Sequence, residues 1–173
     1  MGVHRLNHAV LYVRDAERSA AFYCEHLGFR RIAEYVFPGG AFLRAEGSTN
    51  DHDLALFTIG EGAAASPAGR GVVGLYHLSW EVDTLADLRR LAGALGAVGS
   101  LVGATDHGTT RALYCHDPDG LEFELTWLVP AALLGPDDGP AMRPLDLDAD
   151  IARFGADTLG GVGVSRPLPV RPA

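Results

Sequence analysis

The stretch LNHAVLYV, residues 6–13, recurs in altered form as LYHLSWEV, residues 75–82. Counting from His8 to His77 gives a spacing of 69 residues (77 − 8), and the same spacing aligns the two runs from end to end. Both runs are rich in Val, Leu and aromatic residues, which is typical of β-strands. An internal repeat of this kind predicts two similar supersecondary units that bury their faces together.

A helical stretch follows each of these strands. In the first copy, Asp15 is placed to cap the helix and Gly28 to end it. In the second copy, Thr84 with Asp87 three residues later resembles a capping box. The second helix is also predicted by an apolar stripe at helical spacing: Leu85, Leu88, Leu91, Ala92 and Leu95. Three short strands are then expected in each copy, over 30–36, 41–45 and 53–59 and over 97–102, 111–116 and 122–128.

The pattern predicts an α+β fold with one domain over residues 1–130, built from two βαβββ modules. The expected boundaries are 4–60 for module one, 61–71 for a Gly-, Ala-, Ser- and Pro-containing linker, and 72–130 for module two. Beyond Pro130 the periodic pattern lapses, so residues 131–173 are expected to form a C-terminal extension. Within it, 146–154 is expected to be a short helix, and the Pro-rich stretch 165–173 is expected to be disordered and dispensable for folding.

Composition narrows the class of partner. The net charge is −8 and no run is rich in Lys or Arg, which argues against a nucleic-acid partner. The apolar runs are too short to cross a bilayer, and the first residues lack the pattern of a signal peptide. Cys24 and Cys115 are the two cysteines and are expected as reduced thiols. We therefore expect a cytoplasmic protein with no membrane partner.

Four segments carry a resemblance to a known family. They are NHAVLYV (7–13), FY with LGF (22–23 and 27–29), YHLSWEV (76–82) and DPDGLEFEL (117–125). In these segments the chain resembles the vicinal oxygen chelate superfamily, which includes glyoxalase I, extradiol ring-cleaving dioxygenases, fosfomycin-modifying enzymes, epimerases and bleomycin-binding proteins. The resemblance implies βαβββ modules whose mixed sheet curls around a metal-holding cleft.

The resemblance also implies which residues hold the metal. In the superfamily, ligands come from the first and last strands of the modules, which points to His8, His77 and Glu124. Glu122 has the same strand parity as Glu124 and is an alternative, but it is not at the position where the superfamily places its ligand. Two imidazoles and one carboxylate suit Fe(II) best if the protein activates O₂, and also suit Mn(II) or another divalent ion.

The repeat tests the number of ligands. Position 55 is 69 residues before Glu124 (124 − 69) and is alanine, which has no donor atom. Glyoxalase I enzymes usually have a Glu or Gln there, so the sequence predicts three protein ligands where they have four. A site with three protein ligands leaves open positions for a substrate and O₂.

Two further residues are candidates for catalysis. Asp106-His107-Gly108 precedes the strand that carries Tyr114, as in many small ring-cleaving dioxygenases of this superfamily. The resemblance makes His107 an acid–base group and Tyr114 a hydrogen-bond partner of the metal-bound substrate. The alternative is that His107 binds a carbonyl of a turn and Tyr114 is a core aromatic. His52 and Arg111 are additional candidates for substrate binding.

We therefore expect a metal-dependent extradiol-type dioxygenase that acts on a catechol-like aromatic diol and O₂. A second possibility is a glyoxalase-like lyase, isomerase or transferase of the same superfamily. A third, of another class, is a non-catalytic drug-binding resistance protein, against which the intact set His8, His77 and Glu124 counts. One chain carries both modules, so a homodimer is an expectation from the superfamily alone.

Overall fold

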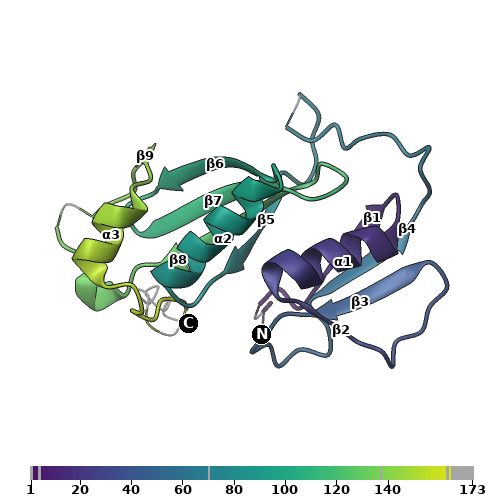
Figure 1. Ribbon diagram of the computed structural model, residues 1–173, viewed down its shortest axis with the longest axis horizontal. Helices are drawn as coiled ribbons and strands as arrows, with labels where there is room; N and C mark the ends of the chain where they lie inside the picture. Colours follow the sequence, from purple (N-terminus) through teal and green to yellow (C-terminus); the bar gives the residue numbers. More distant parts are fainter. Residues whose placement is uncertain (1, 4, 70, 137, 163, 165–173) are drawn as a thin grey trace. The chain divides into compact units, whose positions relative to one another are not determined.

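The computed structural model describes residues 2–3, 5–69, 71–136, 138–162 and 164, and the stretch 165–173 lies outside the described residues. The chain forms two compact units, each with its own sheet (Figure 1). Unit 1 takes in the chain up to Val72 together with Asp117–Leu121. Unit 2 takes in Val73–His116 and the described residues from Glu122 onward.

Unit 1 is a βαβββ module with the sheet order β1-β4-β3-β2. Strand β1 is parallel to β4, and the other neighbours are antiparallel. The predicted helix caps are confirmed, since the Asp15 side chain accepts from two backbone N–H groups of the first turn and Gly28 is left-handed with φ 76°. The elements are β1 (Ala9–Val13), α1 (Ala16–Leu27), β2 (Arg30–Arg31), β3 (Gly40–Arg44) and β4 (Leu54–Thr58).

Unit 2 repeats the same module and adds elements after it. Its sheet order is β5-β8-β7-β6-β9, again with the first two strands parallel. Thr84 caps α2 by accepting from the backbone N–H of Asp87, as predicted. The elements are β5 (His77–Glu81), α2 (Leu85–Ala97), β6 (Leu101–Asp106), β7 (Thr110–His116), β8 (Glu122–Leu128), the 3₁₀ turn η1 (Ala131–Leu133), β9 (Arg143–Pro144) and α3 (Leu147–Phe154). The predicted α+β fold with two βαβββ modules is confirmed, with a separate mixed sheet in each unit.

The strand registers reproduce the repeat residue by residue. In unit 1, Val10 lies opposite Ala55, and in unit 2, Ser79 lies opposite Glu124. Both pairs are related by the 69-residue spacing found in the sequence (79 − 10 and 124 − 55). Ala55 is therefore the structural counterpart of Glu124, as the sequence predicted.

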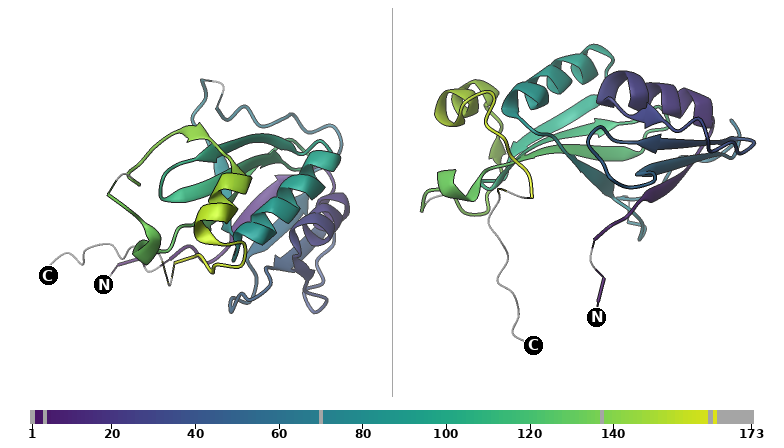
Figure 2. Two further views of the ribbon diagram at one scale, coloured as in Figure 1. Left: turned by 60° about the vertical axis from the view of Figure 1, so that its left-hand side comes forward. Right: turned by 90° about the horizontal axis from the view of Figure 1, so that it is seen from below.

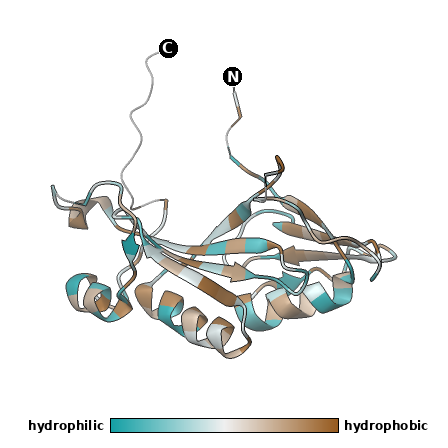
Figure 3. Cartoon of the chain, turned by 90° about the horizontal axis from the view of Figure 1, so that it is seen from above, coloured by the Kyte–Doolittle hydropathy of each residue, from teal (hydrophilic) through white to brown (hydrophobic). Residues whose placement is uncertain are grey.

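In each unit a helix covers one face of the sheet, and alternation along the strands separates the core from the other face (Figure 2). Hydrophilic and hydrophobic residues are interspersed along the helices and strands of both units (Figure 3). In β8, Phe123, Leu125 and Trp127 are at most 2% exposed, whereas Glu122 and Glu124 point to the opposite face. Unit 1 buries Leu43, Leu54 and Leu56 under α1 in the same way.

The strand expected over 97–102 begins later, at Leu101. Helix α2 continues through Ala97, and the chain then turns at Gly99, which is left-handed with φ 72°. The backbone N–H of Ser100 donates to the carbonyl of Leu95, closing the helix end. The prediction was wrong because it ended the helix at Gly96, whereas the left-handed conformation is taken by the later glycine.

The Asp-Pro-Asp-Gly turn between β7 and β8 belongs to unit 1. The Asp119 carboxylate is 3.0 Å from Nη1 of Arg14 and 2.6 Å from Nη2 of Arg18, and it also accepts from the backbone N–H of Arg14. Asp117 accepts from the backbone N–H groups of Asp119 and Leu121. Its burial raises the pKa of its carboxyl group. The turn is thus tied to unit 1 by charge-assisted hydrogen bonds.

The C-terminal extension is packed into unit 2. Strand β9 pairs with β6, and α3, which forms where the sequence predicted a short helix, contacts α2. Arg111 is 2% exposed, with Nη1 2.8 Å from Asp106 and Nε 2.8 Å from Asp150 of α3. Its guanidinium also lies 5.3 Å from the ring centroid of Phe154. A buried cation thus joins the module to the extension.

This position gives Arg111 a structural role. Along β7 it alternates with Ala112 and Tyr114, so its side chain lies on the helix-covered face, opposite Tyr114. Both of its carboxylate partners come from within unit 2. The prediction that Arg111 binds substrate therefore finds no support in its position, because its guanidinium is paired inside unit 2 and lies on the face opposite Tyr114.

Within the described residues, no helix is both long enough and apolar enough to span a membrane.

Removing one partner of Arg111 is expected to destabilise the protein. Asp150→Ala should lower the free energy of unfolding by about 3 kcal/mol, the lower end of the scale for removing one partner of a buried ion pair, because Asp106 still faces the guanidinium. Urea denaturation measures it. The matched control is Asp148→Ala on the same helix, whose side chain is 91% exposed in its pair with Arg89 and should change stability by less than about 1 kcal/mol. Equal effects of the two changes would contradict a buried ion pair.

Asp138 should contribute to stability in a defined acid range. A hydrogen bond from Arg153 lowers the pKa of Asp138 to about 2, against about 3.9 in an unfolded chain. A lowered folded-state pKa means that the contribution is complete above about pH 4 and is lost as the pH falls through about 2. The unfolding free energy of Asp138→Asn should therefore fall less steeply than that of wild type between these pH values, whereas Asp148→Asn should follow wild type.

Candidate functional site

The face of the unit 2 sheet that α2 leaves uncovered carries a row of polar side chains. Strand alternation brings His77 of β5 beside Glu122 and Glu124 of β8. The register then places Tyr114 of β7 directly opposite Glu124. Three adjacent strands thus gather imidazole, carboxylate and phenol groups on one surface.

His77 lies between two carboxylates. Its Nδ1 is 3.5 Å from Oε1 of Glu122, and its Nε2 is 3.5 Å from Oε2 of Glu124. Nδ1 of His77 and Oε1 of Glu122 are buried and have no hydrogen-bond partner among the described residues. Buried polar atoms normally have a hydrogen-bond partner or coordinate a cation. These two atoms are therefore suited to a cation that is coordinated by both imidazole nitrogen and carboxylate oxygen. The distances alone do not distinguish Glu122 from Glu124.

Tyr114 connects this cluster to His107. The Tyr114 hydroxyl is 2.8 Å from Nε2 of His107. Burial and the neighbouring Glu124 carboxylate raise the pKa of Tyr114 to about 12, so its phenol stays protonated at neutral pH. Nδ1 of His107 is 3.2 Å from the carbonyl oxygen of Ala141. The sequence offered an acid–base role or a carbonyl contact for His107, and the structure brings both kinds of partner to its ring.

His8 belongs to unit 1 and lies immediately before β1. Its Nδ1 is 2.7 Å from the side-chain oxygen of Asn7. An imidazole that donates from Nδ1 to an oxygen has a free lone pair on Nε2, the arrangement found in most metal-bound histidines. Asn7, to which the sequence gave no role, is thus suited to orient His8.

His52 lies beside His8 in unit 1. The two ring centroids are 4.4 Å apart, and His52 also contacts the rings of Phe42 at 5.4 Å and Tyr35 at 6.2 Å. Nδ1 of His52 is 3.1 Å from the Asp51 carboxylate. The sequence proposed His52 for substrate binding, and an aromatic cluster of this kind provides stacking surfaces for a planar ring.

Across the described part of the chain, no three His, Cys, Asp or Glu side chains are close enough together to form a metal site. His77 and Glu124 are neighbours within unit 2, and His8 is a residue of unit 1. Ala55 is 1% exposed and has no donor atom.

The cysteines provide no nucleophile in this region. Burial raises the pKa of Cys115 to about 12 and also raises the pKa of Cys24. Both are free thiols and are protonated at neutral pH. This agrees with the absence of a CxxC motif in the sequence.

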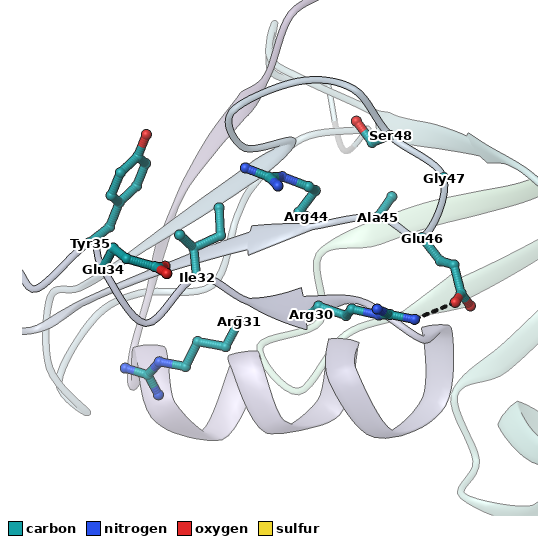
Figure 4. Close-up of a pocket in the computed structure, with 10 residues that line it drawn as sticks. All are labelled: Arg30, Arg31, Ile32, Glu34, Tyr35, Arg44, Ala45, Glu46, Gly47 and Ser48. Atoms are coloured by element: carbon teal, nitrogen blue, oxygen red, sulfur yellow. Dashed lines mark hydrogen bonds and ion pairs between the residues drawn. The ribbon is translucent and has the colours of Figure 1, made fainter.

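A pocket in unit 1 lies beside β2 and β3 (Figure 4). Three arginines contribute to its lining: Arg30, Arg31 and Arg44. Arg30 pairs with Glu46, Arg31 pairs with Glu17, and Arg44 donates to the carbonyl of Asp51. Each guanidinium already has a partner, and the pocket meets the aromatic cluster around His52 at Tyr35.

Sequence reasoning missed two groups of unit 2. Tyr76 lies beside His77, with ring centroids 4.7 Å apart, and the Glu122 carboxylate raises its pKa. The adjacent Tyr-His pair in the repeated strand was a signal that could have identified it. The Ala141 carbonyl had no such signal, because it is a backbone atom 34 residues from His107.

Comparison with known proteins gives consistent matches. Residues 5–125 match the family model described as the Glyoxalase/Bleomycin resistance protein/Dioxygenase superfamily. A catechol-2,3-dioxygenase of Bacillus subtilis is 33% identical over 123 residues, which cover 69% of this chain and 40% of that enzyme. A probable lactoylglutathione lyase of Synechocystis is 28% identical over 124 residues, covering 69% of this chain and 92% of that protein.

A solved structure shares the fold. The glyoxylase/bleomycin resistance protein/dioxygenase domain from Frankia superimposes with a TM-score of 0.59 at 22% identity. The alignment covers 72% of this chain and 92% of the Frankia domain.

Proposed function

Because this chain belongs to the glyoxalase/bleomycin resistance protein/dioxygenase superfamily, we propose that it is a metal-dependent extradiol-type dioxygenase acting on a catechol-like aromatic diol. The observation that carries the proposal is the 2.8 Å contact between Nε2 of His107 and the hydroxyl of Tyr114, beside Glu124. Ring cleavage needs proton transfer and hydrogen bonding close to the bound diol, and this pair provides both groups.

The proposed metal ligands are His8, His77 and Glu124. When bound, Fe(II), or Mn(II) in its place, would supply a Lewis acid and a common template for the diol and O₂. The 3.5 Å distance between Nε2 of His77 and Oε2 of Glu124 supports this choice, because it places an imidazole nitrogen beside a carboxylate oxygen. Asn7 would hold His8 with its Nε2 lone pair available.

The remaining residues would handle the substrate and its protons. His107 would accept a proton from the diol and return it later, since imidazole exchanges protons near neutral pH. Tyr114, kept protonated by its environment, would donate to Nε2 of His107 in the free protein and would turn its hydroxyl to a substrate oxygen when the diol binds, which frees Nε2. His52 with Tyr35 and Phe42 would pack against the aromatic ring.

A lyase of the glyoxalase type is the second candidate. It is supported by the match to the probable lactoylglutathione lyase of Synechocystis, which covers 92% of that protein. Ala55 counts against it, because the structural counterpart of Glu124 lacks a donor atom. Drug binding without catalysis is the third candidate, and the paired His107 and Tyr114 count against it.

Metal content should distinguish the two carboxylates that flank His77. We expect Glu124→Ala to reduce the affinity for Fe(II) by at least tenfold more than Glu122→Ala, because loss of a ligand exceeds the roughly 10–100-fold effect of a group that only orients one. Anaerobic titration with Fe(II), followed by metal analysis, measures both. His8→Ala should also lose the metal.

The two alanine variants are matched, since each glutamate lies 3.5 Å from a ring nitrogen of His77, Glu122 from Nδ1 and Glu124 from Nε2. A larger loss in Glu122→Ala would transfer the ligand assignment to Glu122. Full metal retention by both His8→Ala and Glu124→Ala would remove the proposed ligand set.

His107 and Tyr114 should affect turnover more than metal content. With Fe(II)-loaded protein, catechol and O₂, His107→Ala should lower kcat by about 10²–10⁴, the usual contribution of general acid–base catalysis. Tyr114→Phe removes one hydrogen bond and should lower kcat by about tenfold. The yellow ring-cleavage product and O₂ uptake report the rate, and His26→Ala, an imidazole at the end of α1, is the control.

If wild-type protein loaded with Fe(II) or Mn(II) turns over no catecholic diol, the dioxygenase assignment is wrong. Activity in a lactoylglutathione lyase assay would then support the second candidate. Absence of both activities, with retained binding of small aromatic molecules, would support the third.

A further inference from the structure

The C-terminal extension contacts the His107 turn at three points. The backbone N–H of Ala141 donates to the carbonyl of His107 at 3.1 Å, and the carbonyl of Ala141 lies 3.2 Å from Nδ1 of the His107 ring. A Cβ atom added to Gly108 would lie 2.0 Å from the carbonyl oxygen of Gly139. The segment 138–141 is therefore in direct contact with both the backbone and the ring of this turn.

Two ion pairs hold that segment in place. Asp138 receives two hydrogen bonds from Arg153 of α3, at 2.9 and 2.6 Å. Arg143 of β9 donates to Asp106, the residue immediately before His107, at 3.0 Å. One pair fixes the start of the segment to α3, and the other fixes its end to the strand that leads into His107.

The two ring contacts of His107 determine where its proton lies. A backbone carbonyl can only accept a hydrogen bond, so Nδ1 must carry the proton when it faces Ala141. In a neutral imidazole the other nitrogen then has a free lone pair, and Nε2 faces the hydroxyl of Tyr114. The Ala141 carbonyl has the place that a carboxylate has in many histidine-dependent enzymes.

We propose that the segment 138–144 is a positioning element that fixes the Nδ1–H tautomer of His107 and aims its basic Nε2 at Tyr114. Ala141 acts through its backbone, and Asp138, Arg143 and Arg153 hold that backbone in position. The catalytic meaning of this element rests on the proposed function, whereas the tautomer itself does not.

The opposite arrangement is disfavoured by the same contacts. Tyr114 has one proton and two nearby acceptors, Nε2 of His107 and the Glu124 carboxylate. In the alternative pattern, the Tyr114 proton goes to Glu124, and Nε2 of His107 donates to the Tyr114 oxygen. A neutral His107 ring would then have no proton on Nδ1. Its Nδ1 lone pair would face the Ala141 carbonyl oxygen, so that two acceptors would lie against each other. The segment 138–144 therefore decides between two hydrogen-bond patterns that the sheet alone would permit.

Nitrogen-15 NMR of the full-length, metal-free protein tests the tautomer directly. The His107 signals are assigned by their absence from His107→Gln. At about pH 8 we expect a pyrrole-like Nδ1 and a pyridine-like Nε2 for His107. A protonated Nε2 in its place, or a ring protonated on both nitrogens at that pH, would overturn the proposal.

Two variants test the role of the segment. Gly108→Ala places a methyl group against Gly139 and should push the segment away, so that the two nitrogen shifts of His107 move toward each other. The matched control is Gly99→Ala, another left-handed glycine of unit 2 (φ 72° against 81°) whose added Cβ meets nothing within 4 Å. It should leave the His107 signals unchanged.

Arg153→Gln provides a second test without a steric change. The Arg153 side chain is 49% exposed, so the variant is expected to fold, and it should also bring the two nitrogen shifts of His107 closer together. The role of the segment would be overturned if the His107 nitrogen chemical shifts in both Gly108→Ala and Arg153→Gln equalled those of wild type. It would also be overturned if Gly99→Ala changed these chemical shifts as much as Gly108→Ala does.

The functional consequence is measured separately. If the proposed dioxygenase activity is present, Arg153→Gln should lower kcat by about tenfold with little change in KM. This decrease in kcat should be smaller than the decrease caused by His107→Ala. An unchanged kcat alongside a changed tautomer would show that the element has no catalytic effect. If no activity is found in wild type, the proposed function fails while the NMR result still decides the tautomer.

Discussion

The two-residue alternation of β8 is the constraint on which the rest of unit 2 depends. One face of this strand supplies Phe123, Leu125 and Trp127 to the core, and the other supplies Glu122 and Glu124 to the polar surface. A slip of one residue in the pairing with β5 would exchange the two faces and bury two carboxylates. Burial of unpaired carboxylates is costly enough that the core and the site specify the same register.

The repeated module has been used in two different ways. The registers of β1 with β4 and β5 with β8 are equivalent, but the uncovered face of unit 1 carries the aromatic cluster around His52, whereas that of unit 2 carries charged and hydroxyl groups. Ala55 in place of a carboxylate is one instance of this difference. Each half therefore keeps the backbone of the module and changes its side-chain chemistry.

The sequence was informative wherever a local signal determined the structure. The 69-residue repeat predicted the strand pairing that relates Ala55 to Glu124, and Asp15, Gly28 and Thr84 predicted the helix ends because caps act within one turn. These inferences need only chain neighbours or strand parity. The family resemblance singled out Tyr114, and the register of β7 with β8 places it opposite Glu124.

Long-range pairing could not be predicted in this way. In the sequence, Arg111 is simply a charged residue within an expected strand. Its burial depends on its ion pair with Asp150 of α3, which is 39 residues further along the chain (150 − 111). The contact of His107 with Ala141 involves a backbone carbonyl, which has no sequence signature. Glu122 and Glu124 have equal parity and equal distances to His77, so the choice between them rests on the family pattern.

The membership of the Asp117–Leu121 turn has a consequence for synthesis of the chain. Unit 1 takes its last piece from a turn that follows most of the unit 2 module in sequence, and Asp119 of that turn pairs with Arg14 and Arg18 near the start. During translation, the N-terminal half therefore emerges without Asp119, with only the contacts of Arg18 to Glu61 and of Arg14 to the carbonyl of Ala63 among those described for these cations. It must wait for about fifty more residues, at roughly 5–20 residues per second, before it is complete. Unit 1 can therefore be completed only after most of the unit 2 module has been synthesised. A ribosome-bound fragment ending in the linker would lack the Asp117–Leu121 turn of unit 1.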